Sequence, residues 1–133
     1  MKIIFVNGCF DVLHPGHIQL FEYAKSLGDY LIVAIDSDQK VAQMKGKERP
    51  IFCQEDRART LEAIRYIDVV HIFNSKEELE NLIKTINPDI MVVGSDWKDK
   101  SVIGSYYAAK VIFFDRIDEY STTKIIQSII DRG

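Results

Sequence analysis

Residues 3–17 read IIFVNGCFDVLHPGH, and this stretch decides how the chain is expected to fold. The apolar run Ile3–Val6 predicts a short strand buried on both faces, as in a parallel sheet. Gly8 follows this strand and lets the backbone pass close to a ligand. Pro15 suits the first turn of a helix, because the N–H that proline lacks has no helical partner there. The stretch therefore predicts a strand, a tight turn and the start of a helix.

Apolar runs rich in Val, Ile and Phe recur along the chain and alternate with segments of helical periodicity. After Ile3–Val6 the runs are Tyr30–Ile35, Val69–Phe73, Ile90–Val93 and Val111–Phe114. Helical periodicity predicts helices over residues 18–27, 37–44 and 55–66. A fourth helix is expected to begin at a Ser75–Glu78 capping box and to end before Pro88, and a fifth to follow Ser121. This alternation predicts an α/β fold: a Rossmann-like, doubly wound, five-stranded parallel sheet of order 3-2-1-4-5. We expect one domain over residues 1–133, with ligands bound beyond the carboxyl ends of the strands.

Composition narrows the class of protein. The chain has 133 residues, 47% of them hydrophobic and 28% charged, which disfavours disorder. Its net charge of −3 argues against nucleic-acid binding through a broad basic surface. No apolar run reaches the roughly 18 residues of a membrane span. The apolar run at the start, within Met1–Val6, is too short for a signal peptide. Cys9 and Cys53 fit neither a zinc motif nor CxxC, so we expect reduced thiols in a cytoplasmic protein.

Two histidines lie three residues apart at the predicted helix start. His14 and His17 would share one face of its first turn, where unpaired backbone N–H groups also attract anions. Both imidazoles could donate hydrogen bonds to phosphate and stabilise charge that builds up in a transition state. Two alternatives are a zinc site, which would need further ligands, and a purely structural role.

The segment Gly8–His17 has the form G-x-F-D-x-x-H-x-G-H and so resembles the signature of the nucleotidylyltransferase superfamily, which includes the cytidylyltransferases. The resemblance implies that His14 and His17 contact the nucleotide phosphates. It also implies that the nucleotide is contacted by Gly8, Cys9, Phe10 and Gly16. Asp11 would contact the acceptor.

A second segment resembles the same superfamily near the end of the chain. The family carries a distal R-T-x-G-[IV]-S-T-[ST] motif, which Arg116 and Ser121–Thr123 match, whereas Glu119 replaces its glycine. The resemblance implies that Arg116, Ser121, Thr122 and Thr123 bind the triphosphate. Read from the residues alone, the segment could equally be a serine-capped helix start with a solvated face.

Three sites between these segments have a plain and a functional interpretation. The basic stretch Lys45–Pro50 is either a solvated loop or a lid whose Lys45 reaches a substrate phosphate. Arg57 either forms a surface ion pair or, as the resemblance implies, contacts the acceptor's phosphate or the triphosphate. Gly94, Asp96 and Trp97 either form an ordinary loop or, as in cytidylyltransferases, border the nucleotide base.

The resemblance implies attack by an acceptor's phosphate oxygen on the α-phosphorus of a nucleoside triphosphate, with release of pyrophosphate. We expect CTP and a phosphorylated polyol such as glycerol 3-phosphate. The alternative is ATP with a heptose 1-phosphate, as in ADP-heptose synthesis, and a catalytically silent nucleotide-binding protein is an alternative of another class. Mg²⁺ is expected to arrive with the nucleotide rather than on protein ligands. A homodimer is expected from the resemblance alone.

Overall fold

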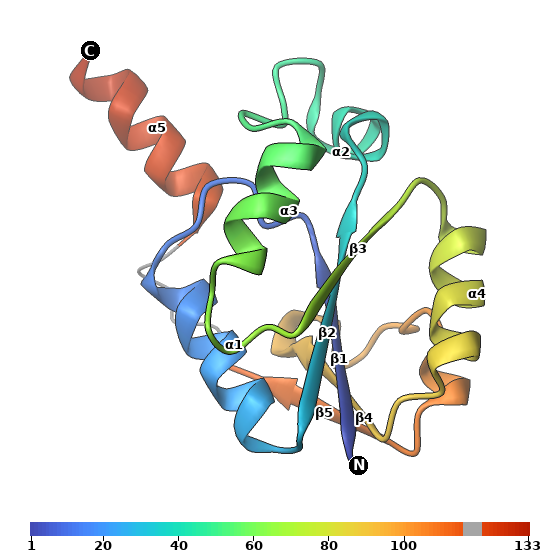
Figure 1. Ribbon diagram of the computed structural model, residues 1–133. Helices are drawn as coiled ribbons and strands as arrows, with labels where there is room; N and C mark the ends of the chain where they lie inside the picture. The colour runs from blue at the N-terminus through green and yellow to red at the C-terminus, as the bar shows by residue number, and fades with distance from the viewer. Residues whose placement is uncertain (116–120) are drawn as a thin grey trace.

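The structure is a computed structural model that describes residues 1–115 and 121–133, apart from the side chain of Asp96. Its five strands form one parallel sheet in the predicted order β3-β2-β1-β4-β5 (Figure 1). The strands are β1 (Ile3–Gly8), β2 (Tyr30–Asp36), β3 (Val69–Phe73), β4 (Ile90–Gly94) and β5 (Lys110–Phe114). Because all strands are parallel, their carboxyl ends meet at one edge, called here the carboxyl edge.

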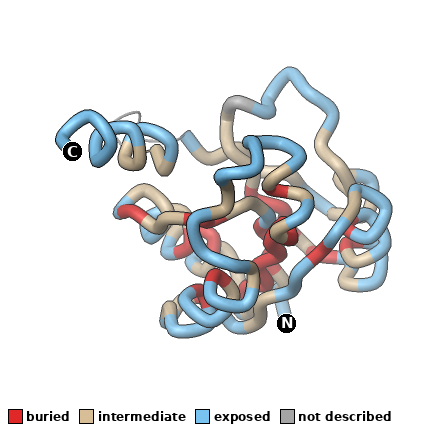
Figure 2. The backbone as a smooth tube through the Cα atoms, turned by 90° about the horizontal axis from the view of Figure 1, so that it is seen from above, coloured by how far each residue is buried: buried red, intermediate tan, exposed pale blue. Residues whose placement is uncertain are grey.

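Helices cover both faces of the sheet, with α1 and α3 on one face and α4 on the other (Figure 1). The helices are α1 (Pro15–Ser26), α2 (Asp38–Lys45), α3 (Gln54–Glu62), α4 (Lys76–Ile86) and α5 (Thr122–Arg132). Two core clusters result: Phe21 and Leu61 pack on one face, and Leu79 and Ile83 on the other. Figure 2 shows the buried residues gathered in the middle of the molecule, where the strands lie.

The end of one helix differs from the prediction. Helix α3 ends at Glu62 rather than Tyr66, because the Ile64 and Ile67 N–H groups donate to carbonyls only three residues earlier. These tight turns bring Ile67 into the core. Helix α4 begins at Ser75 as predicted, with the hydroxyl accepting the Glu78 N–H at 3.1 Å. It ends at Asn87 in the left-handed region, one residue before Pro88.

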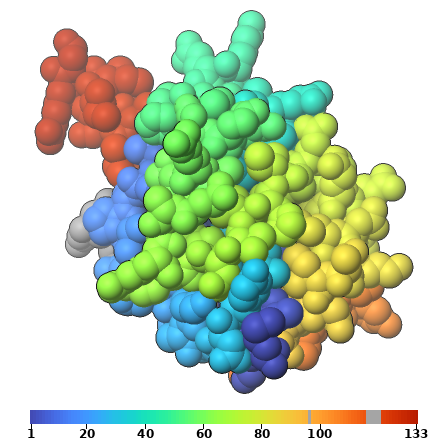
Figure 3. All heavy atoms as spheres, in the orientation of Figure 1, coloured from blue at the N-terminus to red at the C-terminus, as the bar shows by residue number. Residues whose placement is uncertain are grey.

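Helix α5 stands apart from the rest of the molecule, as Figure 3 shows. It contains no buried residue, and Ile129 and Ile130 are 65% and 63% exposed. Its first residue, Thr122, ties it to the segment before α1, because the Thr122 hydroxyl donates to the Val12 carbonyl at 2.8 Å. Within the described residues, no helix is both long and apolar enough to cross a membrane.

Candidate active site

The two histidines cap the start of α1. His14 is the N-cap, and its Nδ1 accepts the Gly16 N–H at 3.1 Å. His17 reaches back, so that its Nδ1 accepts the His14 N–H at 3.3 Å. The rings stack with their centroids 3.8 Å apart. His14 thus replaces the N-cap serine of an ordinary capping box, and His17 replaces its glutamate.

This capping fixes the tautomer of both rings. A neutral imidazole has one donor nitrogen and one acceptor nitrogen, so a ring whose Nδ1 accepts carries its proton on Nε2. In their neutral forms His14 and His17 therefore each carry the ring proton on Nε2, beside the positive end of a helix. Two such donors can bind phosphate oxygens and stabilise the charge that develops on them.

Phe10 supports His17 from behind. Its ring packs edge-on against His17 at 5.3 Å and against Phe21 in the core at 5.0 Å. Phe10 has a φ of 49°, and its ring lies over Gly8, where a Cβ would come within 2.9 Å of the ring. Gly8 is therefore needed here to make room for Phe10. Gly16 likewise supports the pair, since its N–H is the group that His14 accepts.

Asp11 is buried and already has partners within the chain. Its side chain is 0% exposed, and its carboxylate accepts from Arg49 Nε at 3.1 Å and from the Ile51 and Phe52 N–H groups at 2.7 and 2.9 Å. The carboxylate thus fastens the basic loop, defined here as Lys45–Phe52, to the segment before α1. In this arrangement both carboxylate oxygens hold the loop, and the direct contact between Asp11 and the acceptor stays a prediction.

Arg57 is also buried, at 1% exposure, which rules out the surface ion pair. Its guanidinium donates to the carbonyls of Cys9 and Asp36 at 2.9 and 2.8 Å, to that of Phe52 at 3.0 Å, and to the Asp38 carboxylate at 2.9 Å. These partners follow β1, end β2, and belong to the basic loop and α2. Arg57 therefore joins the elements around the site from within, and its contact with a phosphate stays a prediction.

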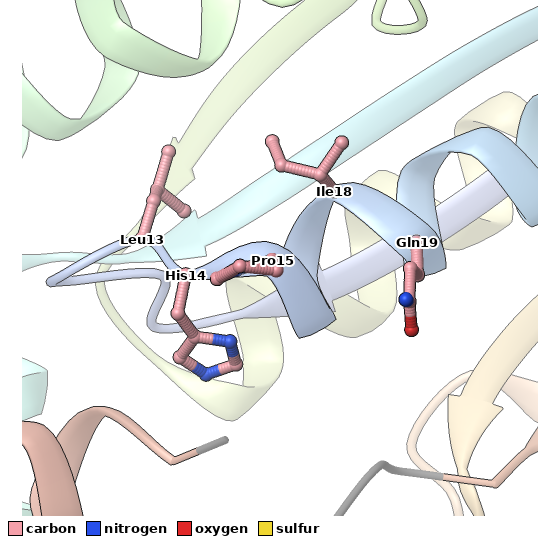
Figure 4. A pocket seen from close by; sticks show the side chains of 5 residues that line it. All are labelled: Leu13, His14, Pro15, Ile18 and Gln19. Carbon is pink, nitrogen blue, oxygen red and sulfur yellow. The ribbon is translucent and has the colours of Figure 1, made fainter. Parts of the chain in front are cut away.

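The start of α5 lies beside the start of α1. Ser121 caps α5 by accepting the Lys124 N–H at 3.2 Å. The Thr122 hydroxyl donates to the carbonyl of Val12, two residues before His14. Figure 4 shows the His14 ring turned toward the side where α5 begins. Thr123 is exposed. The predicted triphosphate residue Arg116 lies outside the described residues, as does the side chain of Asp96.

A chamber of about 650 Å³ opens at the carboxyl edge. It is lined by residues from the ends of β1 to β4, among them Asn7, Gly8, Asp36, Asn74, Gly94 and Trp97. Asp36 pairs with Lys40 at 3.0 Å, with the two side chains only 8% and 14% exposed. Trp97 is 44% exposed. The predicted residues Gly8, Gly94 and Trp97 thus meet at one cavity, large enough for a small polar ligand.

A second, shallower hollow of about 500 Å³ lies on the outer side of the α1 start. Leu13, His14, Pro15, Ile18 and Gln19 line it (Figure 4). Its walls are mostly apolar, and His14 is the lining residue that also belongs to the histidine pair. His14 therefore borders open space next to the helix start.

Lys45, the last residue of α2, is exposed at the beginning of the basic loop. Its positive charge is near Cys9. Burial raises the pKa of the Cys9 thiol, while the charges of Lys45 and Arg57 act in the lowering direction. Both cysteines are free thiols, as predicted. Lys45 is therefore on the same side of the molecule as the segment that carries the histidines.

Three residues at the site were not predicted. Asp36 and Asn74 each come at or directly after the end of an apolar run, so their position in the sequence could have placed them at the carboxyl edge. Arg49 lies in the basic stretch, but nothing in the sequence separates it from the lysines around it. No group of three or more His, Cys, Asp or Glu residues that could hold a metal ion occurs in the described parts of the chain.

The parallel sheet, with a histidine-capped helix start at its carboxyl edge, defines a Rossmann-like α/β domain, and helix starts at this edge commonly bind phosphate groups in such folds. The sequence model of the cytidylyltransferase-like family matches residues 5–128, so the chain belongs to this family. This match confirms the resemblance to the nucleotidylyltransferase superfamily on which the sequence prediction rests.

Similar curated proteins agree on one name. The chain is 46% identical over 127 residues to Bifunctional protein HldE of Campylobacter fetus, and 47% identical over 131 residues to that of Campylobacter jejuni. These alignments cover 96% and 98% of this chain but only 28% of each relative. The chain thus spans about 28% of the length of the curated relatives that it matches.

Similar solved structures support the fold. The lipopolysaccharide core biosynthesis protein of Thermoplasma volcanium superposes with a TM-score of 0.68 at 26% identity, over 91% of this chain and 99% of that one. TmcAL of Thermotoga maritima, bound with alpha-thio ATP, gives a TM-score of 0.66 at 13% identity, over 99% of this chain and 51% of its own. At that identity the second likeness concerns the fold alone.

Proposed function

We propose that this chain transfers AMP from ATP to a heptose 1-phosphate and releases pyrophosphate, the adenylyltransferase step of ADP-heptose synthesis. The observation that carries the proposal is the identity of 46–47% to Bifunctional protein HldE over almost the whole chain. This replaces CTP and glycerol 3-phosphate as the preferred substrate pair, since the relatives favour the alternative. The homodimer remains a prediction from the resemblance.

The proposed chemistry needs no nucleophile from the protein. The acceptor's phosphate is ionised at neutral pH, and one of its oxygens attacks the α-phosphorus of ATP while the bond to the pyrophosphate oxygen breaks. His14 and His17 donate from Nε2 to the phosphates and stabilise the charge that builds up as pyrophosphate leaves. Ser121, Thr122 and Thr123 at the start of α5 lie on the triphosphate side, with Arg116 as a further predicted partner.

The acceptor is proposed to lie in the chamber. The buried Asp36–Lys40 pair and Asn74 offer hydrogen-bond acceptors and donors to sugar hydroxyls, and Gly8 and Gly94 allow close approach to the backbone. Lys45 reaches the phosphates from the basic loop. Mg²⁺ would neutralise part of the triphosphate charge, bound through the nucleotide, because the described carboxylates Asp11 and Asp36 are already paired within the chain.

A pyrophosphate-release screen tests this proposal. ATP and CTP are each paired with heptose 1-phosphate, glycerol 3-phosphate and glucose 1-phosphate. We expect ATP with heptose 1-phosphate to have the highest kcat/KM. Highest activity with CTP and glycerol 3-phosphate would restore the first expectation. Saturable nucleotide binding without turnover of any pair would favour a silent nucleotide-binding protein.

A further inference from the structure

One nitrogen of Arg49 is left without a partner. Its Nη2 is buried and makes no hydrogen bond to any described residue, whereas its Nε donates to Asp11 at 3.1 Å. The Arg49 side chain is only 11% exposed. A buried donor without an acceptor is unfavourable, and more so on a charged group. A ligand that supplies the missing acceptor would explain such a donor.

Asp11 determines where this donor lies. Its fully buried carboxylate holds Arg49 and also the Ile51 and Phe52 N–H groups, so the side chain and the backbone of the basic loop are fixed at one point. A guanidinium is planar, so that fixing Nε restricts the directions in which both Nη groups can donate. Arg49 is therefore preorganised relative to the segment that leads to His14, three residues after Asp11.

The position of the basic loop indicates which phosphate Arg49 would meet. The loop follows α2 and hence β2, which lies next to β1 on the side away from β4. Helix α5, whose start carries the predicted triphosphate residues, follows β5 at the opposite end of the sheet. The two sets of donors come from different elements and meet at one segment, because the Thr122 hydroxyl donates to Val12 and Arg49 Nε donates to Asp11. A displacement at phosphorus has the attacking and leaving oxygens on opposite sides of the reacting atom, so we assign the donor that does not belong to the triphosphate set to the attacking phosphate.

We propose that Arg49 binds the phosphate of the acceptor, and that Asp11 is the positioning residue that holds Arg49 for this contact. This inference rests on the proposed function, because it assigns a role within the same site. A phosphate oxygen supplies the acceptor that Nη2 lacks and suits the geometry of a guanidinium. Arg49 thereby selects acceptors that carry a phosphate over those that carry only hydroxyl groups.

The loop must move for this contact to form. Nη2 is sealed from solvent, but most of the loop is exposed, including all of Lys45–Glu48 and about half of Ile51 and Phe52. The loop opens to admit the acceptor and closes with the phosphate on Arg49. Binding of the acceptor therefore orders the loop, which gives a signal that does not depend on turnover.

Steady-state kinetics of two Arg49 variants test the assignment. We expect Arg49→Gln to raise the KM for heptose 1-phosphate at least tenfold and to leave the KM for ATP within twofold. Arg49→Lys keeps the positive charge but loses the planar guanidinium. Its KM for heptose 1-phosphate should lie between those of the wild type and Arg49→Gln. Lys47→Gln, on the same loop and exposed, is the matched control and should match the wild type. An unchanged KM for the sugar phosphate, or an equal rise in the KM for ATP, would overturn the proposal.

Limited trypsin digestion provides the second measurement and needs no activity. In the wild type, inorganic phosphate is expected to slow cleavage after Lys45 at least fivefold, and in Arg49→Gln it should not. Equal protection of the two proteins, no protection of the wild type, or protection by ATP alone would overturn the role of Arg49. If the screen finds no sugar phosphate that reacts, the proposed function fails, while this comparison still decides whether Arg49 binds phosphate.

Discussion

The rings of His14 and His17 stack 3.8 Å apart at an angle of 21°, and each closes a hydrogen bond with the backbone at the same helix start. The Nδ1 atoms stabilise the start of α1, and the neutral rings then carry their protons on Nε2, the atoms proposed to donate to the substrate. The capping role and the proposed catalytic role thus belong to different nitrogens of each ring, and substitutions can separate them.

Asparagine at either position should preserve the cap and remove catalysis. Its Oδ1 takes the place of Nδ1, and asparagine is a favoured N-cap residue, but it has no counterpart of Nε2. We expect His14→Asn and His17→Asn each to lower kcat by about 10²–10³, the usual loss for one such donor. The melting temperature should stay near that of the wild type. Pyrophosphate release and thermal unfolding measure the two effects.

Alanine at position 14 is the matched comparison. His14→Ala loses the cap as well as the donor, so the free energy of unfolding should fall by about 1 kcal/mol in addition to the loss of activity. Near-normal turnover in His14→Asn or His17→Asn would contradict the assigned phosphate role. Equal stability of His14→Ala and the wild type would contradict the capping role instead.

Gly8 is expected to act on catalysis through Phe10. An alanine Cβ there would come within 2.9 Å of the Phe10 ring, which is wedged between Phe21 and His17. The ring would have to shift and would move His17 with it, so we expect Gly8→Ala to lower kcat at least tenfold. The free energy of unfolding should fall by about 1–3 kcal/mol, as for other overpacked cores. Gly133→Ala, where a Cβ would make only ordinary van der Waals contacts, is the control. A Gly8→Ala enzyme of full activity would argue against this coupling.

Sequence reasoning predicted the sheet and the helix starts, because these depend on local patterns. The continuous apolar runs gave every strand and its order, and Ser75 and Ser121 marked the helix starts that they cap. The roles of Asp11 and Arg57 could not be predicted in this way. Their partners are 38 to 48 residues distant in several of the hydrogen bonds, and spacing in the sequence contains no signal for such contacts. The substrates were likewise undetermined, because residues that bind phosphate do not by themselves identify the base or the acceptor.

Arg57 is predicted to be a determinant of stability. Arg57→Met keeps the bulk of the side chain but leaves the buried Asp36 carbonyl and the partly buried Cys9 and Phe52 carbonyls without this donor. At about 1–3 kcal/mol for each unsatisfied group, the free energy of unfolding should fall by at least about 3 kcal/mol. Urea denaturation measures the loss. Asp38→Asn, which alters only the partly exposed partner, should cost less than about 1 kcal/mol. A stable Arg57→Met protein with a raised KM would instead indicate direct contact with substrate.

The two cysteines should differ in reactivity. Burial raises the pKa of Cys9, so near neutral pH its thiolate fraction is below that of an ordinary thiol, while Cys53 is exposed. Iodoacetamide should therefore label Cys53 first, and labelling of Cys9 should become fast only at more alkaline pH. The folded chain keeps the Cys9 proton to a higher pH than the unfolded chain. This contribution to stability is complete below the ordinary thiol pKa and is lost as the pH rises through the folded value.

Peptide mass spectrometry of the labelled protein measures both rates, with Cys53→Ser to isolate Cys9. Equal labelling rates for the two thiols in the folded protein would contradict the prediction. Unfolding in urea should abolish the difference, because burial is its main cause.

Asp68 should contribute to stability in acid. Burial of its carboxyl acts to raise the pKa, but hydrogen bonds from Lys25 and from the Leu31 N–H, together with the Lys25 charge, outweigh it and lower the pKa. A carboxyl with a lowered pKa stabilises the fold above its unfolded pKa, and this contribution is lost as the pH falls through the folded value. Asp68→Asn should therefore unfold more easily at neutral pH and lose less stability on acidification than the wild type. Urea midpoints across the acid range measure this, and Asp131→Asn, at an exposed position on α5, should follow the wild-type curve. Parallel curves for Asp68→Asn and the wild type would show that the Asp68 carboxylate, directly before β3, does not couple folding to protonation.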